Sequence, residues 1–106
     1  MLNRKIRNDI KKFAGALAAR NVHVAKLVVY GSYAKDTKHG ESDLDLAVIS
    51  ADFGKDRFEE GKLLLQTAWR INPRLHPIPI SIDSLENDTW IPLIHEIREH
   101  GIEISS

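Results

Sequence analysis

The spacing of apolar residues predicts alternating helices and strands along the chain. Near the N-terminus, apolar side chains recur at intervals of four, three and four residues, which places them on one side of a helix over about residues 3–20: Ile6, Ile10, Phe13 and Leu17. The run "VAKLVVYG" is short and β-branched, and it ends at Gly31, as a buried strand does. "LDLAVIS", residues 44–50, has the same character, so we predict two strands here.

The second half of the chain continues the alternation. Between Asp56 and Arg70, apolar residues stand at helical spacing until Asn72-Pro73 ends the pattern: Phe58, Leu65, Ala68 and Trp69. We expect Trp69 and Trp90 to lie in the core. Isoleucines then alternate with Pro79 and Ser81, which predicts an edge strand, because a missing amide donor is tolerated only there.

The last third of the chain carries end signals for two short elements. "DSLEND" is typical of a capped turn, with Asp83 and Glu86 at the spacing of a capping box. "DTWIPLIHEIREHG" predicts a final helix that Asp88 caps and Gly101 ends. "IEIS" then closes the chain as a short strand.

Length and element order together predict the fold class. A chain of 106 residues with 42% hydrophobic residues suits one compact domain with one core, spanning residues 1–106. Helices that alternate with strands favour an α/β or α+β domain, in which helices flank a small mixed sheet. The same fold class serves many functions, so function has to come from a site.

Charge and cysteine content narrow the range of functions. Basic and acidic residues balance at 15 each, so no overall basic field favours nucleic acid as the main partner. The charges are nevertheless segregated, because the first 20 residues hold six basic residues and one acid, whereas residues 36–60 hold eight acids. The basic helix predicts a solvated face, with a partner or RNA surface as the alternative. Without cysteine, a secretory leader or an 18-residue apolar run, we expect a cytoplasmic protein that does not enter membranes.

The stretch "VVYGSYAKDTKHGESDLDLAVIS" carries the candidate chemistry. Gly31 lets the chain turn sharply off a strand, and Ser32 then starts a helix whose free N–H groups can hold a phosphate. Asp43 and Asp45 stand two apart on a strand, so both side chains leave the same face. Taken singly, each half is an ordinary turn or strand start. Together they predict a phosphate cradle beside two oxygen ligands, as Mg²⁺-nucleotide chemistry requires.

These residues resemble the signature of the nucleotidyltransferase superfamily related to DNA polymerase beta: Gly-Ser, about ten residues, then Asp-x-Asp. Within it the chain is similar to the minimal nucleotidyltransferase (MNT) domains, which are often paired with a HEPN-domain partner. The resemblance implies the nucleotidyltransferase fold, in which Gly31 and Ser32 contact the phosphates of the nucleotide. It also implies that Asp43 and Asp45 bind divalent metal, expected as two Mg²⁺ ions. Lys35 stands where family members carry a basic residue.

Three functions follow from this resemblance. The first is a Mg²⁺-dependent transferase that moves a nucleoside monophosphate, most simply AMP from ATP, to a hydroxyl, which is expected on a HEPN-protein partner. The second is an antitoxin-like module that acts by binding its partner, with or without catalysis. The third is a nucleotide-binding domain with no reaction. The chain is too short to include an acceptor-binding domain, which favours a complex.

The third acid of the superfamily has two candidate positions. The family pattern is hydrophobic-Glu-Pro before a proline-rich strand, and the matching stretch "RLHPIPIS" puts His76 in that place. A neutral imidazole could accept a proton from the acceptor hydroxyl but brings no negative charge to the metal. Asp83 is the alternative. With His76, the resemblance implies a slow or conditional transferase.

Overall fold

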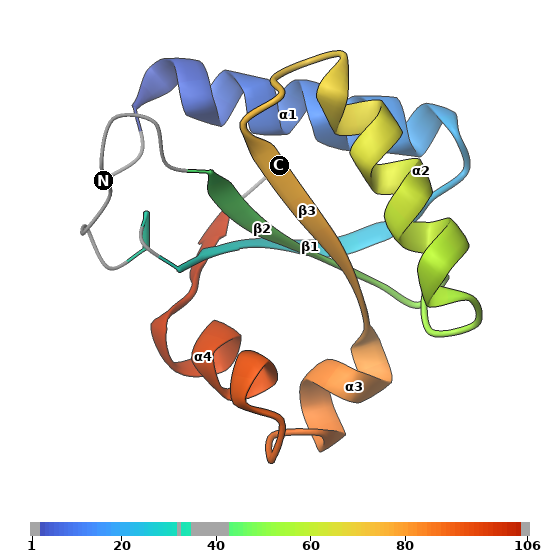
Figure 1. The fold of residues 1–106 in the computed structure, drawn as a ribbon, viewed down its shortest axis with the longest axis vertical. Coiled ribbons are helices and arrows are strands. Elements are labelled where there is room, and N and C mark those ends of the chain that lie inside the picture. The colour runs from blue at the N-terminus through green and yellow to red at the C-terminus, as the bar shows by residue number, and fades with distance from the viewer. Residues whose placement is uncertain (1–2, 32, 35–42, 105–106) are drawn as a thin grey trace.

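The computed structural model describes residues 3–31, 33–34 and 43–104, which form a four-stranded sheet with two helices on each face (Figure 1). The helices are α1 (Arg4–Ala19), α2 (Arg57–Trp69), α3 (Ile82–Asn87) and α4 (Pro92–His100), and the strands are β1 (Val24–Tyr30), β2 (Leu44–Ser50), β3 (Leu75–Ser81) and β4 (Ile102–Ile104). The predicted mixed sheet flanked by helices is confirmed. The helix expected to begin at Ser32 falls mainly outside the described residues.

The sheet has the strand order β3-β2-β1-β4. β1 is antiparallel to both β2 and β4, whereas β2 and β3 run parallel. β3 lies at an edge, as its prolines predict, so Pro77 and Pro79 need no second ladder partner. Since β1 is antiparallel to its neighbour, its carboxyl end and the amino ends of β2 and β3 meet at the same end of the sheet.

Alternate residues of β2 serve two separate cores. Leu46 and Val48 face the layer of α1 and α2, where Phe13 is fully buried. Ala47 and Ile49 face α3 and α4. Figure 1 shows the two helix pairs on opposite sides of the central strands. Because neighbouring strand residues point to opposite faces, a strand buried on both sides becomes a continuous apolar run. No helix in the described part of the chain is long and apolar enough to cross a membrane.

The predicted apolar face of α2 was wrong in part. Leu64, Thr67 and Ala68 are the buried residues of this helix, whereas Phe58 and Trp69 are 76% and 70% exposed. The sequence "LLL" at residues 63–65 offers apolar side chains to more than one face, so periodicity alone does not choose between them. Trp90 is also exposed, and the prediction that both tryptophans are core residues is therefore incorrect.

Two predicted caps also differ from the structure. Ser81, and not Asp83, caps α3, and its hydroxyl accepts a hydrogen bond from the Ser84 amide at 3.0 Å. Asp88 closes α3 and accepts from the Ser84 hydroxyl instead of capping α4, which begins with Pro92 in its first turn. The segment "DSLEND" thus lies mostly in a helix, because the serine two residues before it caps that helix.

Candidate active site

Three chain segments bring their functional residues together at one end of the sheet. Tyr30 at the end of β1 pairs with Asp45 of β2, and Asp45 pairs in turn with His76 of β3. Gly31, which follows Tyr30, therefore lies on one side of Asp45, and His76 lies on the other. This register places Gly31, the Asp45 carboxylate and the residue at the third-acid position side by side.

Gly31 and Asp45 are in close contact. Gly31 has φ +74°, in the left-handed region that glycine adopts without steric penalty. A Cβ at this position would collide with Asp45 Oδ2. The turn therefore requires glycine for two reasons, its backbone conformation and the space that the carboxylate occupies.

The second oxygen of the same carboxylate faces His76. The distance from His76 Nδ1 to Asp45 Oδ1 is 3.5 Å, which is a long polar contact. The Asp45 side chain is 31% exposed and that of His76 is 54% exposed, so both remain accessible to a ligand. When Nδ1 carries the proton toward Asp45, Nε2 is left as the acceptor nitrogen of the imidazole.

Asp43 stands one residue before β2 and is exposed. It lines a groove of about 650 Å³ together with His76, residues of α2 and Arg20 at the end of α1. His76 thus connects the two carboxylates, since it contacts Asp45 directly and shares the groove with Asp43. The prediction that both aspartates serve one site is compatible with this arrangement.

The Asp45 carboxylate affects the pKa of the Tyr30 hydroxyl, which lies beside the site. Burial, together with the negative charges of Asp45 and Glu96, raises the pKa of Tyr30 to about 12. The Tyr30 side chain is only 8% exposed and packs in the α3/α4 core. Tyr30 therefore stays a neutral phenol at the base of the site and is not available as a proton acceptor near neutral pH.

Asp83 lies at the opposite end of β3. His76 pairs with Asp45, whereas Ser81 pairs with Ser50, five residues or about 16 Å further along the strand at roughly 3.3 Å per residue. Asp83 follows in α3, where its carboxylate accepts a hydrogen bond from the Asn87 side chain at 2.8 Å. Of the two candidates for the third-acid position, only His76 is placed beside Asp45.

Comparison with known proteins identifies the family. The family of polymerase beta nucleotidyltransferases matches residues 9–106. The chain belongs to this nucleotidyltransferase family. The resemblance deduced from "GSYAKDTKHGESDLDL" is therefore confirmed. No match to a curated protein was found.

Two solved structures share the nucleotidyltransferase fold. One is a toxin-antitoxin with AMP-PNP, at 21% identity and a TM-score of 0.56 over 94% of this chain and 73% of that chain. The other is a mutant of the toxin-antitoxin MntA-HpeT, at 19% identity and a TM-score of 0.56 over 99% of this chain and 74% of that one. At these identities the likeness establishes the fold.

The donor set of this nucleotidyltransferase suits a hard divalent cation. Mg²⁺ is usually held by one or two carboxylates, with water and substrate phosphates completing its shell. Asp43 and Asp45 supply such carboxylates, and Gly31 lies against Asp45 without a side chain that would displace its carboxylate. Within residues 3–31, 33–34 and 43–104, no group of three or more acidic, histidine or cysteine side chains could hold a metal alone. Two carboxylates together with the phosphate oxygens of a nucleotide are a ligand set that fits Mg²⁺.

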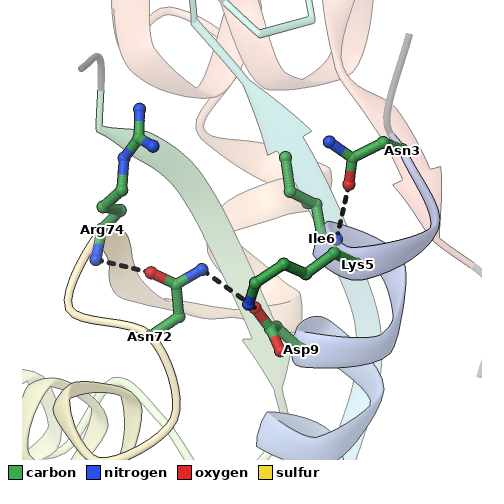
Figure 2. Close-up of polar contacts among 6 residues, drawn as sticks. All are labelled: Asn3, Lys5, Ile6, Asp9, Asn72 and Arg74. Atoms are coloured by element: carbon green, nitrogen blue, oxygen red, sulfur yellow. Dashed lines mark hydrogen bonds and ion pairs between the residues drawn. The ribbon is translucent and has the colours of Figure 1, made fainter. Parts of the chain in front are cut away.

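A buried polar network holds the loop that leads into β3 (Figure 2). Asp9 of α1 is only 5% exposed and accepts hydrogen bonds from Lys5 Nζ and Asn72 Nδ2, both at 3.0 Å. Asn72 Oδ1 accepts from the Arg74 amide at 2.9 Å, and the Arg74 carbonyl accepts from the Leu44 amide at 2.8 Å. The network connects α1 to the first residues of β2 and β3. Asp45 and His76 are the second residues of these two strands.

Sequence reasoning left three features of the site undecided or unnoticed. Ser32 and Lys35 lie outside the described residues, so their roles stay predictions. No sequence pattern marks Asp9, because a single acid in a basic helix is typical of a surface residue. The predicted core position of Trp69 is wrong, since its side chain is exposed and lines the groove with Asp43 and His76.

Proposed function

We propose that this chain is a Mg²⁺-dependent nucleotidyltransferase that moves a nucleoside monophosphate, AMP from ATP in the simplest case, to a hydroxyl group on a partner protein. The observation that carries the proposal is the register of Tyr30, Asp45 and His76, which brings Gly31, the Asp45 carboxylate and the imidazole together at one end of the sheet. Family membership supports the reaction class.

Different residues of the chain have different roles in the proposed in-line displacement at the α-phosphorus. The turn at Gly31 and Ser32 binds the β- and γ-phosphates, and Lys35 adds a positive charge there. Asp43 and Asp45 would hold Mg²⁺, which would supply positive charge against the negative charge that develops on the phosphate. The acceptor oxygen forms a bond to the α-phosphorus, the bond to the bridging oxygen breaks, and pyrophosphate leaves with that electron pair.

His76 is proposed as the group that accepts the proton of the acceptor hydroxyl. Its Nδ1 faces Asp45 Oδ1, so the carboxylate favours the tautomer in which Nε2 is free to accept. A neutral imidazole can accept a proton from a hydroxyl but supplies no negative charge to the metal. A slow or conditional transferase is the consequence.

A HEPN-domain protein is the proposed partner and source of the acceptor. Support comes from the resemblance to MNT domains and from the two similar structures, which are a toxin-antitoxin with AMP-PNP and a toxin-antitoxin mutant. The second candidate is a binding module that inhibits its partner without transfer. It is favoured by one observation, the histidine in place of a third carboxylate beside Asp45.

The test is a calorimetric titration with ATP and Mg²⁺, paired with transfer of labelled AMP to the co-purified partner. Asp43→Asn with Asp45→Asn should abolish the Mg²⁺-dependent part of binding and all transfer. Asp83→Asn, which removes a carboxylate from the far end of β3, is the matched control and should leave both unchanged. Mg²⁺-nucleotide binding in the double variant equal to that of the parent would refute the site. Binding without transfer would favour the binding module.

A further inference from the structure

The groove beside the reaction centre has a second set of side chains that the proposed metal chemistry does not use. Its wall on the α2 side is formed by Leu65 and Trp69, with Pro73 from the following loop. Trp69 is 70% exposed and Leu65 is 47% exposed, an unusual amount of free apolar surface for a helix that also packs on a core. Arg20 and Arg70 line the same groove from the ends of α1 and α2.

Both arginines are available to bind an anion. Neither guanidinium makes a hydrogen bond or ion pair with another side chain in the described part of the chain, and both residues are exposed. A cation at a helix C-terminus is also favoured by the helix dipole, which accounts for the charge at these two positions. The dipole does not account for the exposed indole that lines the same groove.

We propose that this groove binds a nucleotide, with the base stacked on Trp69 and a phosphate held by Arg20 and Arg70. A flat aromatic surface next to guanidinium groups matches a ligand that is itself a flat ring linked to an anion, because bases stack on indole and arginine pairs with phosphate. The volume of about 650 Å³ is within the range of small-molecule and cofactor sites. The inference rests on the proposed function, because it assigns a binding position to a nucleotide of that reaction.

The groove and Gly31 lie on different sides of Asp45, which makes the groove a separate subsite. Gly31 approaches Asp45 from the β1 side through Oδ2, whereas His76, which lines the groove, approaches from the β3 side through Oδ1. A nucleotide in the groove would therefore reach Asp43 and His76 from the side opposite the phosphate turn. The base in the groove belongs to one of two ligands. It is either the base of the donor nucleoside triphosphate, which would then extend from the groove past Asp45 to Gly31, or the base of a second nucleotide.

Tryptophan fluorescence tests the proposal directly, because the chain has only two tryptophans. Trp90→Phe leaves Trp69 as the single reporter, and Trp69→Phe leaves Trp90, which lies in the α3–α4 turn, as the matched control. Titration with AMP in the absence of Mg²⁺ should quench Trp69 emission to saturation and leave Trp90 emission unchanged. By calorimetry, Trp69→Ala should weaken AMP binding by about tenfold to a hundredfold, the range expected for one stacked base.

The phosphate part of the proposal has its own comparison. Arg20→Gln and Arg70→Gln should each weaken AMP binding several-fold while leaving adenosine binding unchanged, since adenosine lacks the phosphate. Equal effects on AMP and adenosine, or no quenching of Trp69 at millimolar AMP, would overturn the proposal. If the groove is instead a contact surface for a protein, AMP will not quench Trp69, and Trp69 emission will change only when the partner protein is added.

The source of the base is distinguished by adding AMP-PNP with Mg²⁺ first. A groove that holds the donor's own base will then bind no AMP, and calorimetry will count one nucleotide per chain. A groove for a second nucleotide will still bind AMP and give two. The proposed function is tested separately, because Asp45→Asn, which changes no residue of the groove lining, should remove most of the Mg²⁺-dependent binding, whereas quenching of Trp69 by AMP without metal should persist.

Discussion

Asp45 is the residue on which the geometry of the site depends, because its two oxygens face different neighbours. Oδ2 lies against Gly31 and Oδ1 faces His76 Nδ1. A change on either side therefore acts through the same carboxylate, but by a different physical mechanism. A side chain at Gly31 displaces it by contact, whereas a charge at position 76 acts on it through space.

Gly31→Ala should damage binding and stability together. The positive φ should cost about 1–2 kcal/mol in an L-residue, and the new methyl group would push the Asp45 carboxylate from its place. We expect a lower free energy of unfolding in urea and at least a tenfold loss of Mg²⁺-ATP affinity by calorimetry. Gly61→Ala is the control, because a Cβ there meets no atom within 4 Å. That helical position should gain stability, and equal losses in both variants would contradict the argument.

His76→Glu should separate metal affinity from stability. Without metal, a second carboxylate beside Asp45 adds like-charge repulsion, so the free energy of unfolding should fall. With Mg²⁺ the same charge becomes a ligand, so Mg²⁺ affinity and transfer rate should rise. His76→Gln, which removes the imidazole without adding charge, should lower the transfer rate and leave Mg²⁺ affinity near that of the parent. The test compares urea unfolding with and without Mg²⁺, and a stability loss that Mg²⁺ does not reverse would count against His76 as a neighbour of the metal.

At the scale of elements, the sequence predicted the strands of the site better than the helix that borders it. β1 and β2 contain continuous apolar runs at residues 27–30 and 46–49, because these parts of the strands are buried on both faces, and the Gly and Asp residues beside the runs stand out against that pattern. The three adjacent leucines of α2 give no such contrast, so the exposed position of Trp69 depended on the tertiary packing. The contact of Asp9 with Asn72, 63 residues apart, has no local signal at all.

Asp9→Ala should weaken the junction between α1 and the start of β3. It leaves the amide donor of Asn72 in a partly buried place without its acceptor, which costs about 1–3 kcal/mol. Lys5→Ala removes only the exposed partner of the same carboxylate and should cost under about 1 kcal/mol. Urea unfolding of the two single variants measures this difference. In the double variant Asp9→Ala with Asn72→Ala, losses that simply add would show that the two residues are not coupled.

Across the whole molecule, the basic side of α1 lies at the same end of the sheet as the proposed site. Asp9 and Asn72 fix the first half of α1 against the loop that leads to His76 (Figure 2). The exposed residues of this half include Arg4 and Arg7, so a positive surface stands next to a centre that contains Asp43 and Asp45. An acidic partner surface that docks on α1 would present an acceptor hydroxyl near that centre.

Formation of a complex through α1 is therefore the prediction at this scale. Co-expression with the protein encoded next to this one, followed by gel filtration at micromolar concentration, should give one peak that contains both chains. Arg4→Glu with Arg7→Glu should weaken the complex at least tenfold, because attraction becomes repulsion, and the remaining affinity should depend less on salt. Lys62→Glu, an exposed charge change on α2, is the matched control. Two separate peaks for the parent proteins would contradict the complex, and equal weakening by Lys62→Glu would show that net charge, and not the face of α1, governs the contact.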